Sequence, residues 1–347
     1  MRVGIFGNEG VGKTTLFRAL GGGSGESPSS APAAGVCTIK VPDDRLDRLA
    51  AIYRPKKTTP ISITFVEIDP GGAALLPPET LARIREVDVL TLVLRGFSDD
   101  FHPAPLGGLD PVAEFRAVDS ELVVSDYLVA QKRIERMTKE ARRDLEWGAL
   151  HKAVEALERE IPLRQLSLTA EEIRVLSGFR FVSQIPLLLV LNVAEGDLSA
   201  EAYPELGEVA SSRHVTLIRL SARIEEEISR LSAEEQSVFL KEMGILQGAR
   251  EQLVRGAFEA MDFICFMTVS EDEVRVWNVR RGTIAVQAAG KIHSDMEKGF
   301  IRAEVIPCEE FFRCGSMAKA KTEGKLRLEG KGYTVQDGDI LQIRFNV

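Results

Sequence analysis

Five short stretches of the chain are almost continuously apolar and rich in valine, isoleucine and leucine. They cover residues 3–6, 61–68, 89–94, 187–191 and 215–220. Unbroken apolar runs of this length are typical of parallel strands that are covered on both faces. Between several of them, for example at residues 14–20 and 81–86, apolar positions recur with helical spacing. The alternation predicts an α/β fold with a mostly parallel, doubly wound sheet.

Helical periodicity takes over between residues 111 and 184. Apolar residues recur every three or four positions from Val118 to Leu157, which predicts two long helices in an antiparallel hairpin that turns near Trp147 and Gly148. Because the strand-like run at 187–191 follows, we expect the hairpin to be inserted into an α/β domain formed by residues 1–110 and 185–262.

Residues 132–143 carry six basic and two acidic side chains. Such a run is usually a solvated helix face, and contact with RNA is the alternative.

The pattern changes again after residue 262. Short strand-like runs occupy residues 264–269, 274–279, 285–288, 301–306, 325–328 and 340–345. The sequence Gln-Asp-Gly-Asp at 336–339 is a strong hairpin-turn signal. We therefore expect a separate, β-rich domain over residues 263–347.

Composition narrows the class of protein. The 347 residues include 44 Lys and Arg against 52 Asp and Glu, a net charge of −8, which argues against wholesale wrapping of nucleic acid or binding to an anionic membrane. No apolar run approaches the roughly 20 residues that span a bilayer, and the N-terminal residues lead into a glycine loop without a secretory signal. The four cysteines form no CxxC pair. Zinc and disulfides are therefore disfavoured, and a cytoplasmic location is the simplest expectation.

The first apolar run leads into Gly7-Asn8-Glu9-Gly10-Val11-Gly12-Lys13-Thr14, a complete G-x4-G-K-[ST] sequence. A glycine loop between a strand and a helix can surround a phosphate chain with backbone N–H groups. Lys13 would contact the β- and γ-phosphates, and the Thr14 hydroxyl would ligate Mg2+. The predicted phosphate contacts are Asn8, Glu9, Gly10, Val11, Gly12, Lys13, Thr14 and Thr15.

A second group for the metal is expected at the end of the second run. There Asp69 heads a D-x-x-G sequence that ends at Gly72. Its carboxylate would hold Mg2+ through water, and the Gly72 N–H would contact the γ-phosphate. A simple turn-forming role is the alternative for an Asp at a strand end.

The fourth run ends in Asn192-Val193-Ala194-Glu195, where GTP-binding domains carry N-K-x-D. Glu195 is one methylene longer than Asp, and Val193 replaces the Lys, so the guanine contacts would be misplaced. The Asn192 amide can accept from adenine N6 and donate to N7, which favours ATP. A plain strand-end turn is the alternative. Ser221 and Ala222 end the next strand and would bring backbone amides to the base.

With these residues identified, the chain resembles the YchF-type Obg-like ATPases, a branch of the P-loop proteins, over essentially its full length. The resemblance is carried by the P-loop, residues 37–39, 42–47 and 192–195, and above all residues 292–305. It implies a G domain interrupted by a helical hairpin and followed by a TGS domain of β-grasp shape. It also implies a preference for ATP over GTP, slow Mg2+-dependent hydrolysis, and association with ribosomes or RNA.

The departures from the family pattern lie at the catalytic centre. Gly10 replaces an Asn that helps to hold potassium in related G domains, and an ungapped match puts Glu67 rather than Asp69 at the metal-side Asp. Thr38 matches the switch threonine that can reach Mg2+. No Gln stands after Gly72 to position water, because that residue is Ala73, so hydrolysis is expected to be slow. His293 would be structural or part of a recognition surface.

These observations predict a monomeric, slow Mg-ATPase, with Lys13 and Thr38 at the reacting phosphate, that acts as a nucleotide-dependent switch toward the ribosome or RNA. Two alternatives stay open. The chain is a nucleotide-sensing protein that has essentially lost hydrolysis, or it is a GTPase in which Glu195 stands in for Asp.

Overall fold

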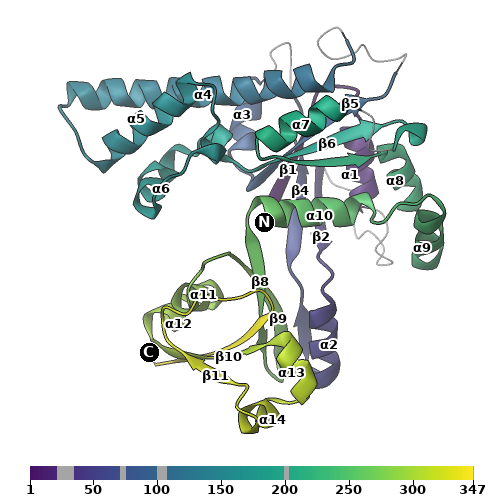
Figure 1. Cartoon of the computed structure of the whole chain (residues 1–347), viewed down its shortest axis with the longest axis vertical. Coiled ribbons are helices and arrows are strands. Elements are labelled where there is room, and N and C mark those ends of the chain that lie inside the picture. The colour runs from purple at the N-terminus through teal and green to yellow at the C-terminus, as the bar shows by residue number, and fades with distance from the viewer. Residues whose placement is uncertain (22–34, 71–75, 100–107, 199–202, 347) are drawn as a thin grey trace. The chain divides into compact units, whose positions relative to one another are not determined.

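The structure is a computed structural model that describes residues 1–21, 35–70, 76–99, 108–198 and 203–346 (Figure 1). The chain divides into two compact units. Unit 1 contains Met1–Ile39 and Thr64–Ala260, and unit 2 contains Lys40–Ile63 and Met261–Val347. Residues 40–63, which the sequence analysis assigned to the nucleotide-binding domain, therefore group with the C-terminal residues.

Unit 1 is built on a six-stranded sheet with the order β2-β4-β1-β5-β6-β7. Strand β1 pairs in parallel with β4 and β5, β5 with β6, and β6 with β7. The strands are β1 (Arg2–Phe6), β2 (Val36–Lys40), β4 (Ser62–Glu67), β5 (Val89–Gly96), β6 (Leu187–Val193) and β7 (Thr216–Leu220). Every residue of β5 and β6 is buried, which explains why these segments are continuously apolar.

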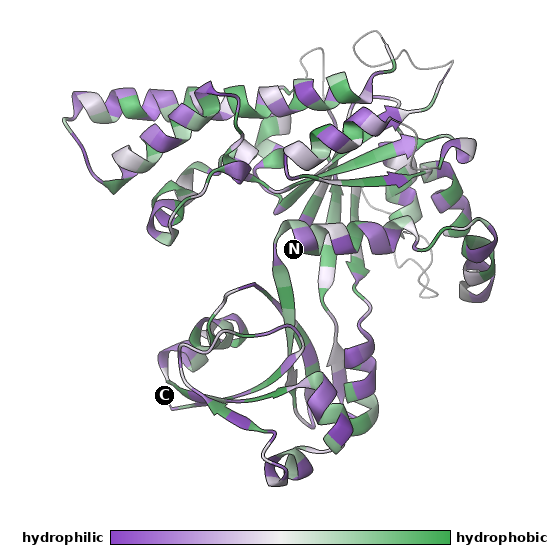
Figure 2. Ribbon diagram, viewed as in Figure 1, coloured by the Kyte–Doolittle hydropathy of each residue, from purple (hydrophilic) through white to green (hydrophobic). Residues whose placement is uncertain are grey.

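Helices cover both faces of this sheet. Apolar side chains of α4 and α7 pack with Leu187, Leu189 and Leu191 of β6, whereas Leu188, on the opposite face, lies against Gly256 of α10. The central strands are correspondingly hydrophobic in Figure 2. The predicted doubly wound α/β fold is confirmed. The helices outside the inserted segment are α1 (Lys13–Gly21), α3 (Pro78–Ile84), α7 (Pro204–Ser212), α8 (Ala222–Ile228), α9 (Ala233–Glu242) and α10 (Ala249–Ala260).

The predicted helical insertion consists of α4 (Pro111–Lys139), α5 (Leu145–Glu158) and α6 (Ala170–Leu176), which we call the helical arm. Helices α4 and α5 lie side by side (Figure 1) and share an apolar core that includes Val123, Met137 and Leu150. The predicted turn near Trp147 is wrong, because Asp144 caps α5 by accepting from Trp147 N and so starts the helix earlier.

Three of the six basic residues in the run at 132–143 form ion pairs with acidic neighbours. Arg133 contacts Glu146 at 2.7 Å, Arg136 contacts Glu140 at 3.1 Å, and Arg142 contacts both Asp144 and Glu146. These pairs favour the interpretation of this stretch as a solvated helix face.

Unit 2 contains a second six-stranded sheet with the order β11-β10-β12-β8-β9-β3. Its strands are β3 (Lys57–Thr59), β8 (Phe263–Val269), β9 (Glu273–Arg280), β10 (Phe300–Pro307), β11 (Arg327–Glu329) and β12 (Asp339–Phe345). Its helices are α2 (Asp44–Tyr53), α11 (Ala285–Ile292), α12 (Ser294–Lys298), α13 (Cys308–Cys314) and α14 (Met317–Thr322).

Two features of unit 2 differ from the sequence predictions. Residues 40–63 belong here because β3 pairs with β9 and because Arg45 of α2 bridges Asp43 and Asp337, each at 2.8 Å. The strand predicted at 285–288 is wrong. It is the start of α11, whose Ala285, Ala288 and Ala289 are fully buried with a helical spacing. None of the described helices has the length and apolar character needed to cross a membrane.

Candidate functional site

The glycine loop occupies the turn between β1 and α1, at the carboxyl edge of the sheet. Gly10 and Gly12 have φ angles of 71° and 93°, which residues with a side chain rarely adopt. A Cβ at Gly12 would also overlap the Asn192 side-chain nitrogen. Helix α1 begins directly at Lys13, so the free N–H groups of its first turn face the loop. The local sequence therefore builds an anion-binding helix start.

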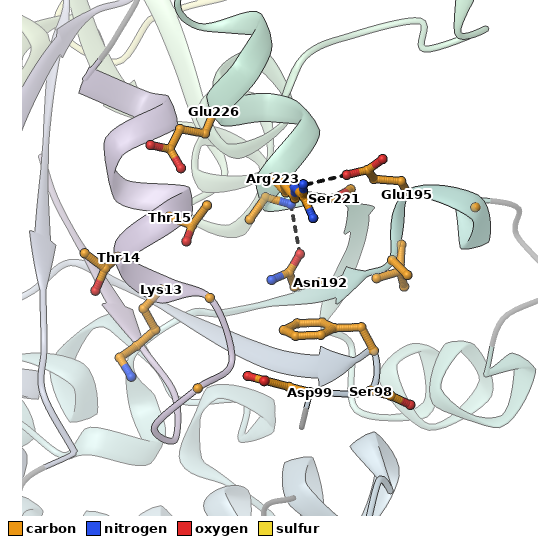
Figure 3. A pocket seen from close by; sticks show the side chains of 17 residues that line it. Lys13, Thr14, Thr15, Ser98, Asp99, Asn192, Glu195, Ser221, Arg223 and Glu226 are labelled. Atoms are coloured by element: carbon orange, nitrogen blue, oxygen red, sulfur yellow. Dashed lines mark hydrogen bonds and ion pairs between the residues drawn. The ribbon is translucent and has the colours of Figure 1, made fainter. Parts of the chain in front are cut away.

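A pocket of about 1030 Å³ opens beside this loop (Figure 3). One side is formed by the loop and the start of α1, and the other by the residues that follow β5, β6 and β7. Its lining residues are Gly10, Gly12, Lys13, Thr14, Thr15, Phe97, Ser98, Asp99, Asn192, Val193, Ala194, Glu195, Gly196, Ser221, Ala222, Arg223 and Glu226. The structure thus brings most of the predicted nucleotide contacts to one cavity.

Lys13 is buried behind the loop and is only 8% exposed. Its Nζ donates to the backbone carbonyl of Asn8 at 2.7 Å. Burial lowers the pKa of Lys13, and the carboxylates of Glu67, Asp69, Glu9 and Glu114 oppose that shift. A cation held by the Asn8 carbonyl beside the loop is placed to contact a phosphate chain bound there.

Thr14 and Glu67 lie together at the predicted metal position. The Thr14 hydroxyl donates to Glu67 Oε1 at 2.7 Å. Asp69 has a different partner, because its side chain is 75% exposed and lies 3.9 Å from Arg83. A hydroxyl and a carboxylate side by side are the oxygen ligands that Mg2+ prefers, so Thr14 and Glu67 fit that ion.

Six of the described residues predicted for the site do not line the pocket, namely Asn8, Glu9, Val11, Thr38, Glu67 and Asp69. Thr38 is exposed on β2, where its hydroxyl lies 3.2 Å from that of Thr64, and it is absent from the pocket lining. Gly72 lies outside the described residues.

Asn192 connects the phosphate side of the pocket to the opposite side. Its Nδ2 donates to the carbonyl of Val11 at 2.9 Å, and its Oδ1 accepts from the N–H of Ala222 at 2.8 Å. The side chain is 5% exposed. Figure 3 shows the bond to the start of α8 and the direction of the amide into the pocket. Asn192 therefore connects the glycine loop to the β7–α8 turn and acts as a clamp between them. One N–H and one oxygen lone pair of its side-chain amide take no part in these two bonds.

The other residues of the predicted base side have different surroundings. Val193 is 2% exposed, and Ser221 is buried at the start of α8. Glu195 is exposed, and its carboxylate lies 3.2 Å from Arg223 (Figure 3). An arginine partner makes that carboxylate less available to a base.

Sequence reasoning missed the segment after β5. Phe97, Ser98 and Asp99 line the pocket, and Figure 3 shows Ser98 and Asp99 on the side opposite Ser221. Arg223 and Glu226 of α8 were missed as well. The position of residues 97–99 directly after a predicted parallel strand was the available signal, because ligands bind outside the carboxyl ends of such strands.

The fold and the site define a P-loop nucleotide-binding protein with an inserted helical arm. Residues 263–346 match the YchF-GTPase C-terminal family, described as a protein of unknown function (DUF933). The ribosome-binding ATPase YchF of Bacillus subtilis is 37% identical, with 100% of both chains covered. The protein of that name from Haemophilus influenzae is 34% identical over 100% of this chain and 99% of its own.

Among solved structures, the Schizosaccharomyces pombe YchF GTPase matches with a TM-score of 0.85 and 27% sequence identity. The match covers 99% of this chain and 97% of that one. The chain therefore belongs to the YchF family of P-loop NTP hydrolases.

Proposed function

We propose that the chain binds Mg-ATP in this pocket, hydrolyses it slowly to ADP and phosphate, and uses the bound nucleotide to control association with the ribosome. The observation that carries the proposal is the single cavity that joins the glycine loop and Lys13 to Asn192 and the β7–α8 turn. The relatives named as ribosome-binding ATPases support both the nucleotide and the partner. A ribosomal partner would place the protein in the cytoplasm.

The phosphate chain is assigned to residues 8–15. Backbone N–H groups of the loop and the start of α1 would hold the phosphate oxygens, and the Lys13 ammonium would stabilise charge on the terminal phosphates. Thr14 and Glu67 would hold Mg2+, with Asp69 as the less favoured carboxylate. Bound Mg2+ would neutralise phosphate charge during the reaction.

The base is assigned to the other side of the pocket. Phe97 offers an aromatic face on which a purine can pack, and Ser221 and Ala222 offer main-chain groups to its edge. Asn192 fixes the turn that presents them. Because Arg223 engages Glu195, a guanine would meet a carboxylate that is already paired, and we expect ATP to bind more tightly than GTP.

Slow turnover follows from the groups available to water. No glutamine is found among the described residues of the pocket, and Thr38 lies outside its lining. Water would attack the γ-phosphorus with little positioning by side chains, so a partner would be needed for faster hydrolysis. The same observations favour a second candidate, a nucleotide sensor in which hydrolysis is essentially lost.

Calorimetric titration of the purified protein with ATP, ADP and GTP in Mg2+ tests the proposal. We expect ATP to bind more tightly than GTP, and Lys13→Ala to weaken ATP binding at least about tenfold, since it removes a charge-assisted contact. Lys132→Ala, an exposed lysine of α4, is the matched control and should bind ATP like the wild type.

Equal or tighter binding of GTP would refute the assigned base preference. Phosphate release measured with and without ribosomes separates the two candidates. Turnover near background in both conditions, with ATP still bound, would replace the slow ATPase by the sensor.

A further inference from the structure

Glu114 is a buried acid close to the glycine loop that the proposed chemistry does not use. It lies in the first turn of α4 and is 2% exposed. Its Oε1 accepts from the Asn8 side-chain nitrogen at 2.7 Å, and the backbone N–H of Arg95 also donates to the carboxylate. Burial raises the pKa of Glu114 to about 7, against these two hydrogen bonds and the charges of Arg95 and Lys13.

Asn8 connects this acid to the catalytic lysine. Its side-chain amide donates to Glu114, while its backbone carbonyl accepts from Lys13 Nζ at 2.7 Å. Glu114 therefore fixes the residue that holds the Lys13 ammonium, without touching the phosphates itself. A displacement of Asn8 would move Lys13 relative to a bound triphosphate.

A helix-terminus role alone does not account for this acid. Acidic residues are favourable in the first turn of a helix, but that effect needs no burial. Asp110 already caps α4, where it accepts from Val112 N and Ala113 N. Burying a carboxylate is costly unless it is hydrogen-bonded. The contact to Asn8 is the specific compensation that the structure provides.

The position of Glu114 also matters for the helical arm. Helix α4 runs without interruption for 29 residues, from Pro111 to Lys139, and Glu114 in its first turn contacts the glycine loop. At 1.5 Å per residue this is a rod of roughly 44 Å. A tilt of the first turn of such a rod would displace its tip.

We propose that Glu114 is a positioning residue. Through Asn8, it couples the conformation of the glycine loop to the first turn of α4, where the helical arm begins. The inference rests on the proposed nucleotide binding. It adds that the nucleotide site is linked to the helical arm through Asn8 and Glu114. Occupation of the loop by ATP would fix Lys13 and Asn8, and Glu114 would then order the first turn of α4.

A double-mutant cycle on Asn8 and Glu114 tests the contact. We expect Glu114→Ala and Asn8→Ala each to weaken ATP binding by about tenfold, since each removes the buried hydrogen bond that fixes Asn8. The double variant should lose little more than either single one. Glu114→Gln keeps an oxygen that can accept from Asn8 and should bind ATP nearly as tightly as the wild type. Glu121→Gln, exposed on the same helix, is the matched control.

Hydrogen exchange of the backbone amides measures the coupling. A residue that only stabilises the fold would not change how much ATP protects α4 from exchange. In the wild type, ATP should slow exchange along α4 as far as the turn at residues 140–144. This ATP-dependent protection should be lost in Asn8→Ala and Glu114→Ala and restored in Glu114→Gln.

Several results would decide against the inference. Wild-type affinity and protection in both alanine variants, or additive losses in the double variant, would overturn the assigned role of Glu114. If Glu114→Ala does not fold, Asn8→Ala decides alone, because it removes the same bond from the loop side. A wild-type protein that binds no ATP would overturn both the inference and the proposed function.

Discussion

Replacing Asn192 with alanine tests the clamp that holds the two sides of the pocket together. The change deletes both hydrogen bonds of the side chain and leaves the carbonyl of Val11 and the N–H of Ala222 without that partner. Val11 and Ala222 are 0% and 1% exposed, so bulk water does not reach them. An unsatisfied buried polar group costs about 1–3 kcal/mol, and the pair therefore costs about 2–6 kcal/mol.

Since water can enter the space left by the side chain, we expect a loss near 3 kcal/mol. At about 2–4 °C per kcal/mol, the melting temperature should fall by roughly 6–12 °C. Scanning calorimetry with and without ATP measures this, because the transition that ATP raises belongs to the unit with the pocket. The same variant should bind ATP at least about tenfold more weakly, because the glycine loop loses its anchor.

The isosteric variant Asn192→Asp separates hydrogen bonding from packing. Its carboxylate can still accept from Ala222, but it presents an oxygen to the carbonyl of Val11 where the wild type presents an N–H donor. It should therefore be at least as unstable as Asn192→Ala. A free energy of unfolding within about 0.5 kcal/mol of the wild type for both variants, the range of ordinary surface changes, would refute the clamp.

Three further outcomes follow from the site. Glu67→Gln should raise the Mg2+ concentration needed for ATP binding at least about tenfold, and Asp69→Asn much less, since only Glu67 contacts Thr14; a larger effect at Asp69 would reverse the assignment. Gly12→Ala should abolish ATP binding in calorimetry, because its Cβ would overlap Asn192 and its φ is 93°; near-normal affinity would contradict this. In the nucleotide-free protein, burial raises the pKa of Glu114 to about 7, so folding favours the neutral form of this side chain. The neutral side chain contributes its full stability below about pH 4.5, and this contribution is lost as the pH rises through 7. Relative to Glu114→Gln, the wild type should lose about 3 kcal/mol over this range in urea unfolding, and a pH-independent difference would argue against a buried, titrating acid.

Local patterns in the sequence were sufficient for much of the fold. The continuous apolar runs predicted five of the six strands of unit 1 and missed β2. The signal was strongest for β5 and β6, because strands covered on both faces carry few polar residues. The glycine loop was recognisable because its structure depends only on residues close together in the sequence. These are Gly10 and Gly12, with their positive φ angles, and Lys13, where α1 begins. The prediction of a strand at 285–288 was wrong because four apolar residues fit a strand or one turn of a buried helix equally well.

Long-range contacts were beyond local patterns. Residues 40–63 join unit 2 through β9 and Asp337, more than 200 positions along the chain. The Asn8–Glu114 bond spans 106 positions, and no local signal identifies its partners. Nor did the sequence distinguish Glu67 from Asp69, since both stand at the end of the same apolar run and only the hydrogen bond from Thr14 to Glu67 separates them.

The structure also changes what the motif at residues 192–195 says about the base. Both polar atoms of the Asn192 side chain bond main-chain groups of the pocket, and this role does not depend on which purine is bound. The residue type therefore carries little information about adenine. The choice moves to Glu195, whose carboxylate must be unpaired to accept from the two nitrogens on the guanine edge. Here it lies 3.2 Å from Arg223 in an exposed pair worth at most about 1 kcal/mol, so a guanine would have to displace the arginine at that cost, whereas an adenine would not.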